Sequence, residues 1–239
     1  MTTDKIAVIR AYLDESKKQL RDNPLYFYGL LTGNQHWRLF PHYRGKTVYL
    51  DIETTGLSEF QDHITTIATY DGIEVKYYVH GENLGDFIDD LDQYDVLVTY
   101  NGKSFDIPFI ERSFGRRINK AHIDLRYILR NLGYTGGLKS CEKQLGLDRG
   151  DLDGVDGYFA VLLWQDYKKS GNKKSLETLL AYNIEDVVNL ETLMIHAYNL
   201  SLKETPFSED LQLSYPAKPT LPFSADLTVI DRIKRAYSI

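Results

Sequence analysis

The sequence predicts an α/β fold in which helices flank a mixed, five-stranded sheet. Residues 47–79 read as three strands, and the last two are joined as a hairpin across the two-residue turn Asp71-Gly72. Strand patterns then alternate with helical patterns, and beyond residue 126 the pattern is helical. Antiparallel strands followed by strand–helix alternation indicate a mixed sheet.

Composition limits the possible classes of protein. The 239 residues, 43% of them apolar, can bury the core of one domain with extensions or of two small domains. The net charge of −6 means that any contact with nucleic acid must rest on local basic patches. A single cysteine, Cys141, excludes an internal disulfide and suits a reducing compartment. Without an apolar signal core or a membrane-spanning run, we expect a cytoplasmic protein that needs no membrane.

The first 44 residues are expected to form a helix and an aromatic wrap. Residues 4–21 read as an amphipathic helix with Ile6, Ile9, Leu13 and Leu20 on one side. Residues 24–44 show no clear periodicity, and six of them are aromatic. Because a linker would be poorer in apolar residues, we expect this segment to wrap against the main domain.

Residues 45–200 are expected to form the main domain. The expected strands are 47–54, 63–70, 73–79, 95–100 and 122–125. The expected helices are 83–91, 105–114, 125–132, 138–145, 158–169 and 176–200. The last has the clearest apolar stripe, and Glu185 and Glu191 are expected to face solvent on it. Residues 201–239 are expected to form a proline-containing extension that ends in a helix from Asp226.

Two carboxylates, Asp51 and Glu53, interrupt the apolar strand 47–54. Since side chains alternate along a strand, both should project from one face, about 7 Å apart. An acid pair on a core strand is costly without compensation, and hard divalent cations that prefer oxygen ligands would compensate it. The alternative is an edge strand with both acids in water.

A third acid, Asp106, follows the buried strand 95–100 at the start of a helix. The alternative is a structural role, because an acid in the first turn of a helix interacts favourably with the helix dipole. Lys103 and the loop amides around Asn101-Gly102 could meet a phosphate, although a solvated turn is the commoner meaning of such a segment.

Tyr182 and Asp186 are four residues apart in the clearest helix, so they share a face. The alternative is a tyrosine half in the core with a solvated acid one turn later.

Together these segments resemble the DEDD superfamily of 3′→5′ exonucleases, which has a ribonuclease-H-like fold. Asp51 and Glu53 match its D-x-E motif. Asn101, Phe105 and Asp106 match N-x-x-x-F-D, and Tyr182 and Asp186 match the Y-x-x-x-D motif of the tyrosine subclass (DEDDy). The histidine subclass would carry histidine where this chain has Ala181. The segments DIETTGL, HIDLR around Asp124, LKSCEKQLGL, Leu163-Trp164 and YNIEDVVNL are similar to the YprB-type ribonuclease-H-like proteins.

The resemblance implies a two-metal site for Mg²⁺ or Mn²⁺ formed by four carboxylates. Asp51 would bridge both ions, Glu53 and Asp106 would complete one site, and Asp186 would complete the other. Tyr182 would orient the attacking water, since a phenol with a reference pKa of about 10 is a poor base at neutral pH.

Substrate contacts are expected beside these acids. Leu57 and Phe105 are candidates for packing against the terminal base or sugar, with core packing as the alternative. Thr54, Asn101 and Lys103 complete the expected contacts. A basic cluster of Arg112, Arg116, Arg117 and Lys120 could follow a strand's backbone or could be a solvated face. Asp124 is expected to be a buried structural acid.

We therefore expect a metal-dependent 3′→5′ exonuclease that acts on the 3′ ends of single-stranded nucleic acid, with DNA favoured and RNA possible. One alternative is a catalytically silent nucleic-acid-binding module of the same fold, although all four carboxylates are present. The other is a structure-selective endonuclease, against which the Y-x-x-x-D motif argues. The sequence does not say which protein partners, if any, the chain has.

Overall fold

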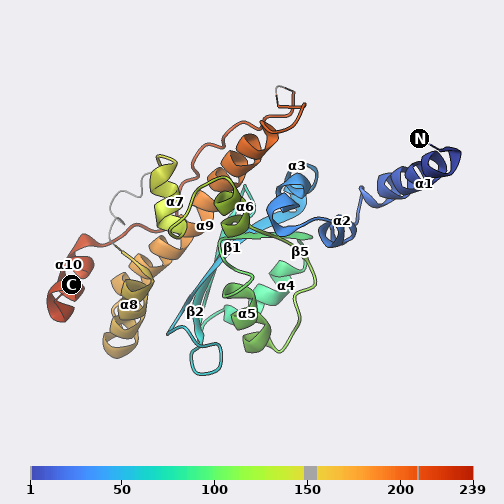
Figure 1. Ribbon diagram of the computed structural model, residues 1–239. Helices are drawn as coiled ribbons and strands as arrows, with labels where there is room; N and C mark the ends of the chain where they lie inside the picture. The colour runs from blue at the N-terminus through green and yellow to red at the C-terminus, as the bar shows by residue number, and fades with distance from the viewer. Residues whose placement is uncertain (1, 148–154, 209, 239) are drawn as a thin grey trace.

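A five-stranded mixed sheet forms the centre of the molecule, as the sequence predicts. The computed structural model describes residues 2–147, 155–208 and 210–238. The strands lie in the order β3-β2-β1-β4-β5, with β1 antiparallel to β2 and parallel to β4 (Figure 1). Their bounds are β1 Thr47–Thr54, β2 Ile64–Tyr70, β3 Val75–Val79, β4 Val96–Thr99 and β5 Ala121–Asp124.

The helices cover both faces of this sheet. The N-terminal ones are α1 Thr3–Gln19, α2 Pro24–Leu30, η1 Gly33–Leu39, α3 Phe40–Tyr43 and η2 Arg44–Lys46. Those between the strands are η3 Leu84–Asp86, α4 Phe87–Leu91 and α5 Asp106–Phe114. Those that follow β5 are α6 Leu125–Asn131, α7 Leu138–Gln144, α8 Gly157–Ser170, α9 Lys173–Leu202 and α10 Leu227–Tyr237.

The alternation of side chains along β1 separates two cores. Val48, Leu50 and Ile52 pack towards α4 and α5. Tyr49 packs on the opposite face, in the larger core that contains α8 and α9. Asp51 and Glu53 are two and four residues after Tyr49, so they project from the same face as Tyr49, the face covered by α9. β1 is also the central strand, so the alternative of an edge strand with both acids in water is wrong.

The aromatic segment from residue 24 is more regular than its sequence suggests. It forms the short helices α2, η1, α3 and η2 in place of an irregular wrap. Pro24 begins α2, and the Asn23 side chain accepts a hydrogen bond from the Tyr26 N–H at its start. Trp37 and Phe40 are buried in the same core as α9. Burial of these rings outweighs the missing apolar periodicity, which short helices cannot display.

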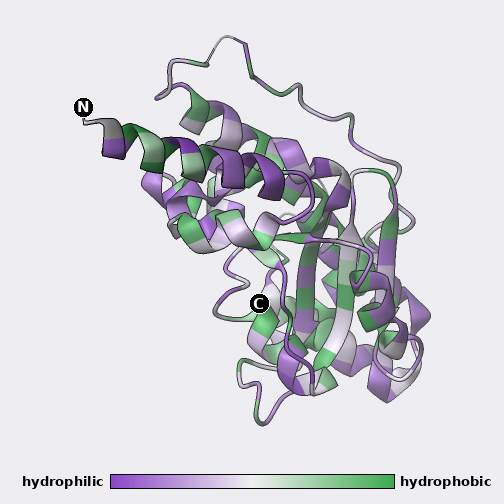
Figure 2. Cartoon of the chain, turned by 90° about the vertical axis from the view of Figure 1, so that its right-hand side faces the viewer, coloured by the Kyte–Doolittle hydropathy of each residue, from purple (hydrophilic) through white to green (hydrophobic). Residues whose placement is uncertain are grey.

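Helix α1 projects away from the sheet (Figure 1). Its apolar side chains Ile9 and Leu13 are exposed, as is Leu20 directly after the helix, while Ile6 is half-buried. Figure 2 shows hydrophobic and hydrophilic residues interleaved along it. The predicted helix is therefore present, with its apolar side open to solvent.

The two glutamates of α9 that were expected in solvent are buried. Glu185 accepts a hydrogen bond from the Lys218 ammonium at 2.5 Å, and Glu191 accepts one from the Arg44 guanidinium at 2.7 Å. The expectation was wrong because both partners come from segments far away in the sequence that cover α9. Lys218 thus also attaches the C-terminal extension to α9.

The end of the extension packs on β3, α8 and α9. Phe223 lies edge-on to Tyr77, and Arg232 on α10 binds both carboxylate oxygens of Asp166 on α8. Within the described residues, no helix is both long enough and apolar enough to cross a bilayer.

Candidate functional site

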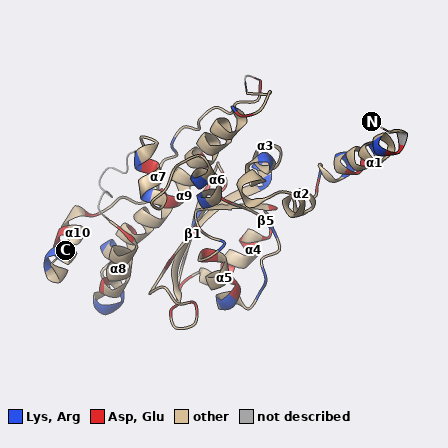
Figure 3. Cartoon of the chain, viewed as in Figure 1, with Lys and Arg blue, Asp and Glu red and all other residues tan. Residues whose placement is uncertain are grey.

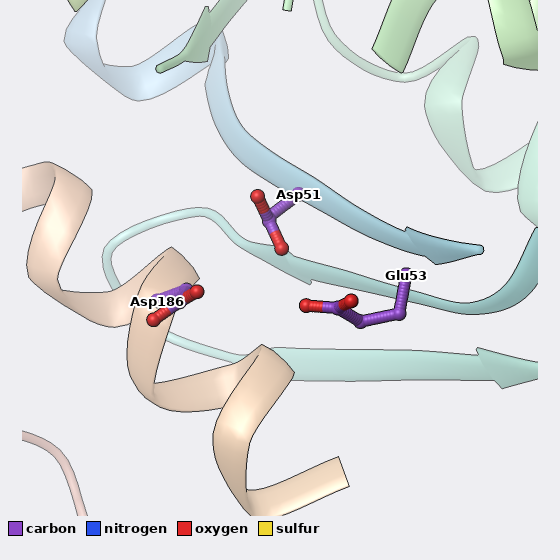
Figure 4. A group of neighbouring side chains, drawn as sticks. All are labelled: Asp51, Glu53 and Asp186. Carbon is purple, nitrogen blue, oxygen red and sulfur yellow. The ribbon is translucent and has the colours of Figure 1, made fainter. Parts of the chain in front are cut away.

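Three carboxylates converge between β1 and α9. Asp51 and Glu53 project from β1, and Asp186 projects from the facing helix (Figure 4). One carboxylate oxygen from each lies within 4.8 Å of the others. The strand alternation brings the first two together, and the packing of α9 on β1 brings the third.

Helix α9 presents Tyr182 and Asp186 to the same cleft. The helix begins after Asn172, whose side chain accepts a hydrogen bond from the Lys174 N–H. The spacing of four residues places Tyr182 and Asp186 one turn apart on one face. Both are 4% exposed, and both line the cleft. The alternative of a solvated acid at Asp186 is wrong.

Asp106 approaches the same cleft from the end of β4. It lies in the first turn of α5, where its carboxylate is buried and lines the cleft beside Asp51. Burial and the nearby charge of Asp124 raise the pKa of Asp106 to about 7. Asp106 lies outside the group of three that converge within 4.8 Å.

The charge of the cleft is concentrated around Asp51. Burial raises the pKa of its carboxyl well above the usual value, and the charges of Asp106, Asp186 and Glu53 raise it further. Such crowding favours protons or a cation. An all-oxygen donor set of this kind matches the preference of hard divalent cations, so the residues fit a magnesium or manganese site.

Asn183 orients Asp51, a role that the sequence did not reveal. Its amide donates a hydrogen bond to Asp51 Oδ2 at 2.7 Å, while its own oxygen accepts one from the Thr66 hydroxyl at 3.0 Å. Asn183 is fully buried, and its hydrogen bond lowers the pKa of Asp51 against the larger effects. The sequence could have indicated this role through the spacing of three residues between Asn183 and Asp186, since residues three apart share a helix face.

The cleft has a volume of about 740 Å³ and a partly apolar wall. Four expected substrate contacts line it: Thr54, Leu57, Asn101 and Phe105. Leu57 is 86% exposed at the opening, so it does not belong to the core. Phe105 is half-buried and also packs against Phe109, with the ring centroids 5.0 Å apart.

Residues of α7 and α8 complete the wall, and nothing in the sequence pointed to them. They are Leu138, Gly157, Tyr158, Val161 and Gln165. Their local pattern does not separate them from other helical residues, because their place depends on how α7 and α8 pack.

Lys103 is not brought to this cleft. Its ammonium lies 3.4 Å from His36 Nδ1 and stands over the rings of Tyr28 and Tyr127, at 5.1 and 5.7 Å. It lines a separate hollow beside Tyr127. Its backbone N–H donates to Asp124, which directs the loop towards the cleft while the side chain turns away.

Asp124 is a buried structural acid, as expected. Its carboxylate accepts hydrogen bonds from the N–H groups of Asn101, Lys103 and Arg126. It therefore joins the loop after β4 to the start of α6. Asn101 adopts the left-handed conformation with φ 66°, which asparagine tolerates better than most residues.

The basic cluster after α5 is held by partners within the chain. Arg116 pairs with Asp92 at 2.9 Å, and Arg117 pairs with Glu111 at 3.1 Å. The Lys120 ammonium donates to the carbonyl of Tyr94. These pairs favour the solvated-face alternative for the cluster.

Comparison with known proteins places this chain in a family. Residues 48–198 match the family model described as the RNase_H superfamily. The chain is 29% identical over 179 residues to the uncharacterized protein YprB of Bacillus subtilis strain 168, a match covering 66% of this chain and 43% of that relative. It thus spans less than half the length of that curated relative.

Solved structures match this chain at low sequence identity. A family B DNA polymerase from Pyrobaculum calidifontis is 19% identical with a TM-score of 0.50, covering 70% of this chain and 27% of the polymerase. NrnC from Brucella melitensis, in a structure bound to pGG, is 17% identical with a TM-score of 0.47, covering 71% of this chain and 79% of NrnC. At such identity the polymerase match bears on the fold alone.

Proposed function

This chain belongs to the RNase_H superfamily, and we propose that it acts as a metal-dependent 3′→5′ exonuclease on single-stranded nucleic acid. DNA is the favoured substrate, and RNA is the alternative. The observation that carries this proposal is the convergence of Asp51, Glu53 and Asp186 within 4.8 Å, in a cleft that Asp106 also lines.

The four carboxylates would hold two divalent cations, Mg²⁺ or Mn²⁺. Asp51 is the candidate shared ligand because the charges of the other three acids all act on it. When bound, such ions polarise a phosphate and lower the pKa of a bound water. The hydrogen bond from Asn183 leaves the other oxygen of Asp51 to face the cluster and fixes the orientation of the carboxylate.

Tyr182 would position the attacking water. Its ring is buried beneath the Lys139 ammonium, which stands 4.6 Å from the ring centroid. A phenol has a reference pKa of about 10, so its contribution is a hydrogen bond rather than proton removal. The rigid helix that carries it also carries Asp186, so both groups are positioned together.

The terminal nucleotide would lie against the apolar wall of the cleft. Leu57 at the opening and Phe105 on the loop offer surfaces on which a base or sugar can pack without sequence preference. Thr54 and Asn101 offer polar groups beside them.

The activity is tested with a single-stranded DNA labelled at its 5′ end and incubated with the protein and Mg²⁺ or Mn²⁺. We expect a ladder of labelled products that shortens from the 3′ end as mononucleotides are released, and no products in EDTA. The same RNA sequence, run in parallel, decides between the two polymers.

A 3′-terminal phosphorothioate separates the alternatives. It should protect the strand from an exonuclease, whereas a structure-selective endonuclease would still cut inside it. A protein that binds the strand but leaves it intact with either metal would be the catalytically silent module.

A further inference from the structure

Two more hollows continue from the cleft across the surface. The first is lined by Tyr100 and Asn101, which also line the cleft, and reaches Arg126, Arg130 and Tyr134. The second begins at Arg130 and is lined by Lys103 and Tyr127. Their volumes are about 660 and 670 Å³. We call this surface, defined by Lys103, Arg126, Tyr127, Arg130 and Tyr134, the basic trough.

The charge of the basic trough is opposite to that of the chain. The protein carries 34 acidic and 28 basic residues, yet the described residues that line the two hollows include three cations and no aspartate or glutamate. Figure 3 shows the colour of Lys and Arg on α6, the helix that carries two of these cations. In an acidic protein, a local patch of this kind is what an anionic polymer requires.

We propose that the basic trough binds the part of a single strand that lies 5′ to the nucleotide in the cleft. This inference rests on the proposed function, because it takes the 3′ end to be at Asp51. The shared residues Tyr100 and Asn101 make the path continuous from the carboxylates to α6.

The cations of the trough differ in how free they are to meet a phosphate. Arg130 is exposed, lines both hollows and forms no ion pair with any described residue. The Arg126 guanidinium donates to the side-chain oxygen of Asn101, so it joins the trough to the opening of the cleft. Arg130 is therefore the main phosphate contact, and Arg126 fixes the junction.

Two aromatic rings that line the hollows give the trough its preference for an unpaired strand. Tyr127 is 44% exposed and lines one hollow beside Lys103, whose ammonium stands over its ring, while the half-buried Tyr134 lines the neighbouring hollow. Bases can stack on such rings only when they are not paired within a duplex. The cluster from Arg112 to Lys120 does not compete for this role, since most of its cations already have partners within the chain.

The test measures, by fluorescence anisotropy in EDTA, how tightly the protein binds a fluorescein-labelled single strand of twelve nucleotides, made once as DNA and once as RNA. Arg130→Glu should weaken binding and reduce the slope of log K against log salt by about 0.7 for each phosphate that the variant no longer neutralises. Tyr127→Ala should weaken binding by about 5- to 150-fold, as for a base that loses its stacking partner. Arg235→Glu on α10, an exposed site with the same charge change, should bind like the wild type.

The inference is overturned if Arg130→Glu and Arg235→Glu bind alike, if the wild type binds neither strand, or if a matching duplex binds as tightly as the strand. Equal thermal unfolding temperatures should show that both exposed substitutions leave the fold intact. Because EDTA prevents metal-dependent cleavage, a loss of binding in Arg130→Glu supports the trough even if no nuclease activity is found. Conversely, 3′→5′ cleavage with unaltered binding in Arg130→Glu rejects only the trough.

Discussion

At the scale of single residues, the cleft holds more negative charge than its surroundings stabilise. A hydrogen bond from Asn183 stabilises the charged form of Asp51, whereas burial and three neighbouring acids destabilise it. Burial and a neighbouring acid likewise destabilise the charged form of Asp106, whose pKa is raised to about 7. Both shifts mean that the folded protein holds a proton on these acids more tightly than the unfolded chain does.

Asp106 should therefore make the metal-free protein less stable as the pH rises. Its contribution is fully present below about pH 4 and is lost as the pH passes through about 7, at a cost of about 4 kcal/mol at most. Asp106→Asn, which resembles the protonated form, should raise the unfolding temperature in EDTA at pH 8 and have little effect at pH 4. Differential scanning calorimetry at the two pH values measures this.

Added Mn²⁺ provides the complementary control for Asp106. At pH 8 the ion should stabilise the wild type more than Asp106→Asn, because the ion replaces the missing proton. If the unfolding temperatures of Asp106→Asn and the wild type differ by the same amount at every pH, the raised pKa of Asp106 is contradicted.

Asn183 should influence metal affinity without touching the ion. Asn183→Ala removes the hydrogen bond that orients Asp51 and leaves the Thr66 hydroxyl without its partner. We expect Mn²⁺ affinity, measured by isothermal titration calorimetry, to fall by about 10- to 100-fold, as for other groups that orient metal ligands. Asn199→Ala is the matched control, since Asn199 lies on the same helix and, among the described residues, its side chain forms hydrogen bonds with the backbone of Leu213 alone. Equal losses in both variants would show a general effect on α9.

At the scale of elements, α9 combines the site with the attachment of distant segments. Its residues Tyr182 and Asp186 face the cleft, while Glu185 and Glu191 bind Lys218 and Arg44. The 30-residue helix is buried along most of its length, which makes it a rigid support for the carboxylate that it contributes.

Loss of the Arg44 partner should destabilise the whole domain. Glu191 is 3% exposed, so Arg44→Met leaves a buried carboxylate without its cation. Because the Arg44 side chain is 39% exposed and the pair is partly screened, we expect a loss of about 1–3 kcal/mol, below the value for fully buried pairs. Urea unfolding measures the change.

A double variant gives the control for this pair. Arg44→Met combined with Glu191→Gln should cost less than the sum of the two single changes, because the unpaired charge is removed. Strict additivity would mean that the two side chains do not stabilise each other.

The elements and residues that the sequence predicted are those set by local spacing. Alternation along β1 placed Asp51 and Glu53 on one face, and the helical period placed Tyr182 beside Asp186. The partners of Glu185 and Glu191, and the turn of Lys103 away from the cleft, depend on contacts between distant segments. For Asn183, local spacing predicts the helix face that it shares with Asp186. Its hydrogen bond to Asp51, 132 positions away, depends on the packing of α9 on β1 and was not predictable.

At the scale of the whole molecule, an acidic cleft and a basic trough lie next to each other on an acidic protein. The central strand β1 and α9 form the cleft, and α6 with the loop after β4 forms the trough. Asp124 connects the two by holding Asn101 and Arg126 in place. This arrangement would lead a strand along positive charge and end it at the carboxylates.

The most direct test of the central claim is the rate of mononucleotide release from a single strand with Mn²⁺, compared between the wild type and Asp186→Asn. We expect a loss of at least about 100-fold, because even groups that only support metal ligands are worth about 10- to 100-fold. Asp231→Asn, an exposed acid on α10, should retain the wild-type rate. Cleavage by Asp186→Asn at the wild-type rate, in a folded protein, would contradict the account.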